Sequence, residues 1–82
     1  MSSMRMMQAV ADADVVITNP THFAVALSYK EGVNGAPVIV AKGQDFLARG
    51  IKEKAKEHRV EIVENKPLAR SLYLFCEIGA EV

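Results

Sequence analysis

The tetrapeptide Asn19-Pro20-Thr21-His22 lies between two apolar runs and carries groups that can react with their own backbone. The side-chain amide nitrogen of an asparagine can attack the main-chain carbonyl of the same residue, which closes a succinimide ring and expels the next residue as a new N-terminus. The competing reaction, in which the next backbone nitrogen attacks the side chain, is closed because Pro20 has no N–H. The chain can therefore break between Asn19 and Pro20 without a protease.

This reaction is very slow in a free peptide, so the fold has to accelerate it. Well-oriented intramolecular reactions gain roughly 7–11 kcal/mol over a bimolecular reference, and the fold supplies part of that gain. Strain in a tight turn could add about 1–3 kcal/mol. His22 could act as a base on the amide or donate a proton to the departing Pro20 nitrogen, and Thr21 could hydrogen-bond to the backbone and fix the turn. The other interpretation is a plain turn, because Asn-Pro is an ordinary turn signal.

Two apolar runs flank the tetrapeptide and must hold it in place. The β-branched run 14–18 predicts a buried strand. The run 23–29 predicts a second strand, one side of which carries Phe23, Val25, Leu27 and Tyr29. If both runs pair in one sheet, ladder hydrogen bonds and apolar packing would keep the pieces 1–19 and 20–82 together after cleavage.

Two further strands are predicted in the rest of the chain. Residues 30–36 contain two glycines and an Asn-Gly pair, which indicates a loop. Residues 37–41 predict a third strand, with a proline at its first position and Gly43 closing it. Residues 60–64 alternate between apolar and acidic side chains and predict a short fourth strand.

Three helices are predicted from apolar residues at helical spacing. A short one over residues 3–11 carries Met4, Met7, Val10 and Ala11. Asp45 is expected to cap a second helix, 46–58, one face of which carries Leu47, Ile51 and Ala55. Pro67 opens a last helix, Gly79 ends it, and its inward side chains are Leu68, Leu72, Phe75 and Cys76.

The predicted order is therefore an N-terminal helix followed by β, β, β, α, β, α. The third strand, its helix and the fourth strand form a βαβ unit, so these two strands should run parallel if adjacent, with a right-handed crossover. We predict an α/β fold, a small mixed sheet of about four strands flanked by helices. Residues 1–12 are expected to be a linker helix segment and residues 13–82 a single domain that contains the cleavable bond.

The composition limits the class of protein. Eighty-two residues suit one small domain, and a hydrophobic content of 50% is compatible with a buried core. The single cysteine, Cys76, excludes an internal disulfide and is interpreted as a small core residue. The apolar runs are shorter than the roughly 18–20 residues of a membrane helix. No metal or other cofactor is indicated, because two distant histidines and one cysteine form no ligand cluster and no phosphate-binding loop is present.

Five basic residues gather around the second predicted helix: Arg49, Lys52, Lys54, Lys56 and Arg59. We interpret this run as a solvated helix face. A small nucleic-acid-binding domain is the alternative, but ten basic and ten acidic residues give zero net charge, which argues against it. No nucleic acid is therefore expected among the partners.

Several longer motifs carry a resemblance to a known family. The stretch ADVVITNPTHFAVALSY resembles the autocleavage region of the FlhB/YscU family of type III export-apparatus proteins. The similarity continues through APVIVAKG, IKEKAKEHRVEIVE, PLARSLY and CEIGAEV, so it covers nearly the whole chain. AVALSY, VAKG and the terminal EIG are more similar to the flagellar branch than to the injectisome branch.

The resemblance implies a function for the tetrapeptide. Family members have a membrane-embedded N-terminal half, a linker helix and a small cytoplasmic domain that cleaves itself once within an NPTH motif, here Asn19, Pro20, Thr21 and His22. Cleavage is linked to a switch in export from rod-and-hook subunits to filament subunits. The implied partners are export-gate proteins, exported substrates and a hook-length ruler protein, and the implied location is the cytoplasmic side of the bacterial inner membrane. The membrane half is absent from this sequence, which suggests an excised fragment or a short homologue.

A different class of function stays open. In a non-cleaving docking module, the helices would bind export substrates or the gate and Asn-Pro would be a turn only. Two smaller features also have two interpretations. Lys42-Gly43 would lie near the tetrapeptide if the second and third strands pair, as a simple turn or a functional contact. Residues 67–70, PLAR, would be a helix start or a partner surface.

Overall fold

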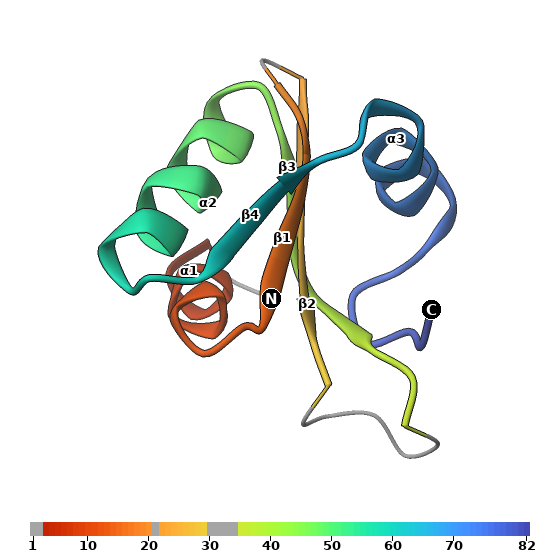
Figure 1. Cartoon of the computed structure of the whole chain (residues 1–82), viewed down its shortest axis with the longest axis horizontal. Coiled ribbons are helices and arrows are strands. Elements are labelled where there is room, and N and C mark those ends of the chain that lie inside the picture. The colour runs from red at the N-terminus through yellow and green to blue at the C-terminus, as the bar shows by residue number, and fades with distance from the viewer. Residues whose placement is uncertain (1–2, 21, 30–34) are drawn as a thin grey trace.

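The computed structural model describes residues 3–20, 22–29 and 35–82. The elements follow in the order α1 (Ser3–Ala11), β1 (Val15–Asn19), β2 (Phe23–Ser28), β3 (Val38–Gln44), α2 (Phe46–Glu57), β4 (Glu61–Glu64) and α3 (Lys66–Phe75) (Figure 1). Each predicted helix and strand is present. Most of the predicted loop 30–36 lies outside the described residues, as does Thr21.

The four strands form one mixed sheet in the order β3-β2-β1-β4, which confirms the predicted α/β fold. β2 is antiparallel to both β1 and β3, whereas β4 runs parallel to β1. The strands of the predicted βαβ unit, β3 and β4, are therefore not adjacent but form opposite edges of the sheet. The reason is that β1, β2 and β3 pair in sequence order, which leaves the outer edge of β1 for β4.

Helices cover both faces of the sheet: α1 and α2 lie on one side and α3 on the other (Figure 1). Successive strand residues point to opposite faces, so Val16 packs toward α1 and α2 while Ile17 packs toward α3. The α1/α2 core consists of Met6, Val10, Val16, Ala24, Ala26, Ala41, Ala48, Ile51 and Ala55. The α3 core consists of Ile17, Val25, Leu27, Ile39, Ala69 and Leu72. Two buried faces explain why β1 and β2 are continuous apolar runs.

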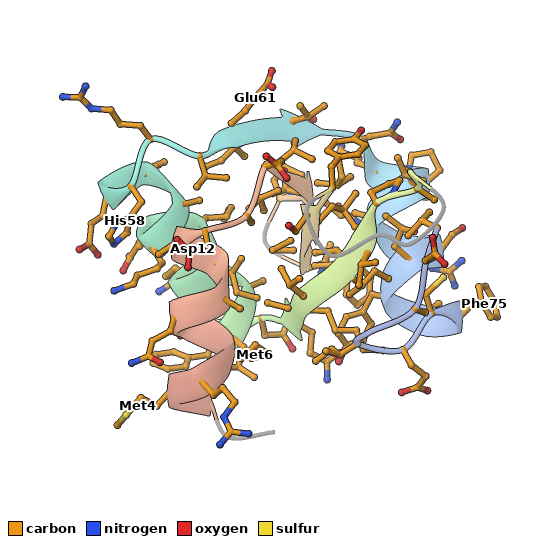
Figure 2. All side chains as sticks on the ribbon, turned by 90° about the horizontal axis from the view of Figure 1, so that it is seen from below. Met4, Met6, Asp12, His58, Glu61 and Phe75 are labelled. Atoms are coloured by element: carbon orange, nitrogen blue, oxygen red, sulfur yellow. The ribbon has the colours of Figure 1, made fainter. Side chains whose placement is uncertain are left out.

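α1 is fixed to the domain by one side of the helix. Met6 and Val10 are buried in the α1/α2 core. Met4, predicted to share the apolar stripe, is instead exposed and points away from the domain (Figure 2). Val10 is buried and Met7 packs against the α1/α2 core, as predicted, so the prediction is wrong only at the start of the helix, where Met6 rather than Met4 faces the domain. The division into a linker segment 1–12 and a domain 13–82 stays a prediction.

Replacing Val10 with alanine tests how far α1 belongs to the folded unit. We expect the free energy of unfolding to fall by about 2 kcal/mol, because buried methyl groups are lost and a cavity is left. Urea unfolding measures this loss. The control is Met4→Ala on the exposed side of the same helix, with an expected change within about 0.5 kcal/mol. An unchanged unfolding midpoint in Val10→Ala would show that α1 contributes nothing to the stability of the domain.

The end of β3 differs from the prediction in two ways. Gly43 lies inside the strand, which continues to Gln44, and it packs beneath α2. Asp45 occupies the N-cap position of α2, but among the described residues its side chain accepts no capping hydrogen bond. Its backbone is in an unusual conformation, with φ of 51° and ψ of −112°. The backbone of Asp45, rather than its side chain, makes the important contact described below.

α3 begins as predicted and buries fewer residues than predicted. Asn65 caps it, accepting a hydrogen bond from the Leu68 backbone N–H at 3.2 Å. Ala69 and Leu72 are buried, whereas Leu68 is partly exposed and Phe75 is 81% exposed, pointing away from the domain (Figure 2). The helix ends at Phe75, and half-buried Cys76 is its C-cap.

Two further sequence predictions are wrong, one about the end of α3 and one about an apolar side chain. Gly79, with φ of 95°, lies in a turn after the helix rather than at its end. On β2, Phe23, Val25 and Leu27 face the α3 core, but Tyr29 lies past the strand end and is exposed.

None of the described helices is long and apolar enough to cross a membrane.

Candidate functional site

The turn between β1 and β2 holds the bond that the sequence analysis marked as cleavable. Asn19 is the last residue of β1 and pairs with Phe23, the first residue of β2. The backbone N–H of His22 donates to the carbonyl oxygen of Asn19 at 2.9 Å, which closes a four-residue turn. Asparagine at the first position and proline at the second are favoured in such turns.

Two backbone hydrogen bonds fix the turn from outside. On the β1 side, the carbonyl oxygen of Thr18, a residue 2% exposed, accepts from the Asn65 N–H at 2.9 Å. On the β2 side, the His22 carbonyl oxygen accepts from the Asp45 N–H, also at 2.9 Å. The turn is therefore held by the β4–α3 junction at one end and by the β3–α2 junction at the other.

The hydrogen bond inside the turn is made to the carbonyl group that would react. The Asn19 carbonyl is the group that the Asn19 side chain would attack, and its oxygen takes up negative charge in the tetrahedral intermediate. A backbone N–H already aimed at that oxygen polarises the carbonyl and stabilises the developing charge, as in an oxyanion hole. Because Asn19 is half-buried, water competes less for this oxygen than at an exposed turn.

The structure brings together Asn19, Pro20 and the backbone of His22. The His22 side chain is exposed, with its ring 6.3 Å from the Phe23 ring at an interplanar angle of 48°. Its assignment as a base or proton donor stays a prediction, and that of Thr21 falls on a residue outside the described ones. Sequence reasoning missed that the His22 backbone N–H donates to the Asn19 carbonyl oxygen. The identity of the side chain could not reveal this contact, because every residue except proline has a backbone N–H.

Sequence reasoning also missed the contacts of Asp45 and Asn65, whose backbone N–H groups approach the turn from elsewhere in the chain. The position of Lys42 and Gly43, in contrast, was predicted. β2 pairs with β3, so Gly43 lies opposite Ala24 and Lys42 opposite Val25, close to the turn as anticipated. The Lys42 ammonium group, however, donates to the backbone carbonyls of Tyr73 in α3 and of Cys76, the C-cap of that helix. Residues 67–70 lie within the first two turns of α3, which confirms the helix-start interpretation of PLAR.

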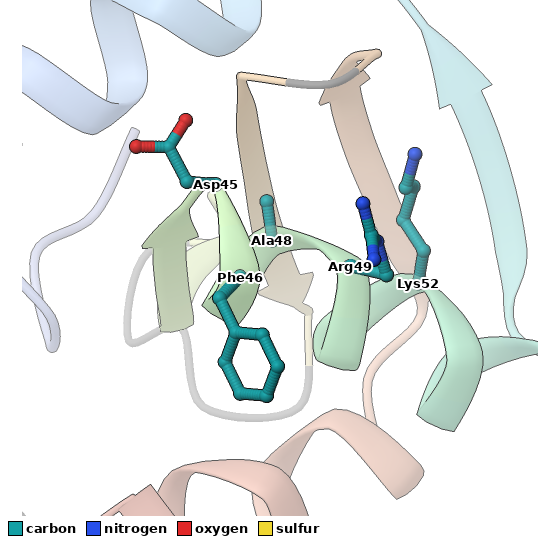
Figure 3. Close-up of a pocket in the computed structure, with 5 residues that line it drawn as sticks. All are labelled: Asp45, Phe46, Ala48, Arg49 and Lys52. Carbon is teal, nitrogen blue, oxygen red and sulfur yellow. The ribbon is translucent and has the colours of Figure 1, made fainter.

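An open pocket of about 350 Å³ lies at the start of α2 (Figure 3). Its lining residues are Asp45, Phe46, Ala48, Arg49 and Lys52. Arg49 and Lys52 belong to the basic run; Arg49 is exposed and Lys52 half-buried. Across the described part of the chain, no group of three or more histidine, cysteine, aspartate or glutamate side chains is arranged to hold a metal ion.

Comparison with known proteins assigns the chain to a family. Residues 1–82 match the family described as the FlhB HrpN YscU SpaS Family. The chain belongs to the FlhB/YscU family. It is 58% identical over 82 residues to the flagellar biosynthetic protein FlhB of Bacillus subtilis, and 51% identical over 78 residues to that of Salmonella typhimurium. These matches span 100% and 95% of this chain but 23% and 20% of those relatives.

Solved structures of FlhB/YscU-type domains share the fold. The cytoplasmic domain of FlhB from Shewanella putrefaciens superimposes with a TM-score of 0.90 at 38% identity, over 99% of this chain and 62% of that one. A mutated EscU C-terminal domain superimposes with a TM-score of 0.86 at 31% identity, over 94% of this chain and 77% of that one. In the EscU structures, an asparagine or the proline directly after it was substituted.

Proposed function

We propose that this chain is a self-cleaving domain of a flagellar-type protein-export component, which breaks its own backbone between Asn19 and Pro20. The observation that carries the proposal is the His22 N–H donated to the Asn19 carbonyl oxygen inside a turn that is anchored at both ends. An asparagine and the proline after it were also the residues substituted in the EscU structures, which supports a role for an Asn-Pro pair in this family.

The proposed reaction is intramolecular and needs no cofactor. The Asn19 side-chain nitrogen forms a bond to the Asn19 carbonyl carbon while the His22 N–H stabilises the oxyanion. The intermediate then collapses, the bond to the Pro20 nitrogen breaks, and the proton lost from the amide is delivered to that nitrogen through His22 or water. Water later opens the succinimide. Each chain reacts once, so the domain is not a turnover enzyme.

The sheet is built to hold both products together. β1, which ends at the broken bond, is an interior strand, paired with β2 on one side and β4 on the other. Val16 is fully buried and Ile17 nearly so, one on each face. Breaking one covalent bond at the tip of this arrangement removes none of these contacts, so cleavage changes the turn locally and leaves the fold in place.

In the export apparatus, such a change would serve as a signal. Family membership and the flagellar biosynthetic relatives support a role in flagellar protein export. We propose that cleavage alters which substrates are accepted, through contacts with gate proteins, exported substrates and the hook-length ruler protein. The domain would act at the cytoplasmic side of the bacterial inner membrane.

Two measurements on one sample test cleavage and retention together. Intact mass under denaturing conditions is expected to give two species, residues 1–19 and 20–82. Native size-exclusion chromatography of the same sample is expected to give one peak that contains both. A single uncut mass after long incubation would contradict self-cleavage and favour the docking module. Two separate peaks would contradict retention by β1.

A further inference from the structure

An aromatic contact links the cleavable turn to α3. Phe23 is the residue directly after His22 and the cross-strand partner of Asn19. Its ring stacks on the ring of Tyr73 from α3, with centroids 4.8 Å apart and an interplanar angle of 28°. Both residues are half-buried. The first residue of β2 is therefore held in place by α3 as well as by its neighbours in the sheet.

Lys42 holds Tyr73 in that position. From β3, its ammonium nitrogen donates to the carbonyl oxygens of Tyr73 at 3.0 Å and Cys76 at 2.8 Å. The same nitrogen lies 5.2 Å from the centre of the Tyr73 ring, within the range of a cation–π contact. A cation at the C-terminal end of a helix is also favoured by the helix dipole. Lys42 thus joins β3 to the end of α3 at the residue that stacks on Phe23.

We propose that Tyr73 and Lys42 are positioning residues for self-cleavage. They act through Phe23, which places the backbone of His22, whose N–H is aimed at the Asn19 carbonyl oxygen. Reactions of this kind lose rate when the reacting groups are misplaced by about 1 Å, so a ring that sets the start of β2 affects the rate without touching the reacting atoms. This inference rests on the proposed function.

The test begins with chemically synthesised 82-residue chains, which are intact until refolded. Cleavage after refolding is followed by intact mass, at a temperature where circular dichroism shows every variant folded. Tyr73→Leu and Lys42→Met are each expected to slow cleavage by about tenfold or more. Tyr73→Phe, which keeps the stacked ring, should restore a rate close to that of the unmodified chain.

A matched control separates positioning from general stability. Ile51→Ala removes a fully buried side chain from the α1/α2 core, on the opposite face of the sheet. It should lower the thermal midpoint at least as much as Tyr73→Leu and still cleave near the unmodified rate. The inference is wrong if folded Tyr73→Leu cleaves as fast as the unmodified chain, or if Ile51→Ala slows cleavage equally.

A second readout does not depend on cleavage. In an Asn19→Ala background, hydrogen exchange of the His22 amide reports the hydrogen bond inside the turn. Tyr73→Leu is expected to speed this exchange, whereas Ile51→Ala under folded conditions is not. If the unmodified chain never cleaves, the proposed function fails, and this measurement alone decides whether Tyr73 orders the turn. Unchanged exchange would overturn the inference.

Discussion

A chain with alanine in place of Asn19 is expected to remain in one piece, with no fragment detected by intact mass after any practical incubation. The methyl group carries no nucleophile, so the succinimide cannot form. The turn itself should survive, because the His22 N–H donates to the main-chain oxygen of residue 19, which alanine also has. The free energy of unfolding should therefore change by no more than about 1 kcal/mol.

The same substitution at Asn65 is the matched control. Asn65→Ala removes the side-chain cap of α3, at a cost of about 1 kcal/mol, but keeps the backbone N–H that donates to Thr18. It should cleave normally. Fragments ending at residue 19 in the Asn19→Ala chain would show that another group, or a contaminating protease, breaks the bond.

Replacing Gly43 with valine is expected to give the largest loss of stability among the variants proposed. A Cβ at this position would lie 2.7 Å from the Cβ of Leu47 and 3.2 Å from its backbone carbonyl carbon. These atoms belong to the first turn of α2 and cannot move aside as a flexible side-chain end can. We expect a loss of about 3 kcal/mol, which in a domain of this size lowers the thermal midpoint by more than about 10 °C.

Gly50→Ala, in the middle of α2, is the matched control for this prediction. Its added Cβ would meet the terminal methyl of Met7 at 3.1 Å, which is the flexible end of a side chain. Alanine is favoured over glycine inside a helix by about 1 kcal/mol, so the thermal midpoint should stay the same or rise. An equal fall of the thermal midpoint in both variants would contradict the prediction that close packing against α2 makes Gly43 the more sensitive position.

The sequence predicted the elements better than their contacts. Periodicity located each helix and strand, because β-branched runs and helical stripes are local patterns. The positions of β3 and β4 at opposite edges depend on which strands pair, which is not a local property. The sequence predicts the end of a strand at Gly43, because glycine commonly marks turns, whereas in the structure the close approach of α2 requires a glycine there. The helical spacing predicts an inward Phe75, but the ten-residue helix α3 buries only Ala69 and Leu72.

The candidate site was found only in part for the same reason. Asn19-Pro20 is recognisable because its chemistry lies in adjacent residues. The turn is held by the backbone N–H groups of Asp45 and Asn65. A backbone N–H is present in every residue except proline, so residue type does not reveal these contacts. Tyr73 contacts Phe23, and Lys42 contacts Tyr73, from distant parts of the sequence, so the positioning role proposed for them follows only from the fold.

Because β1 is an interior strand, the proposed cleavage would also change how the domain refolds. Before cleavage, an unfolded chain regains β1 in a first-order step, because residues 1–19 remain tethered at high effective concentration. After cleavage, the same step is a bimolecular encounter between a peptide and an incomplete sheet, and its equilibrium depends on protein concentration. A cleaved domain that opens in dilute solution would regain β1 more slowly and less completely than an intact one. The proposed cleavage would thus turn an intramolecular fold into a two-piece assembly whose stability depends on protein concentration.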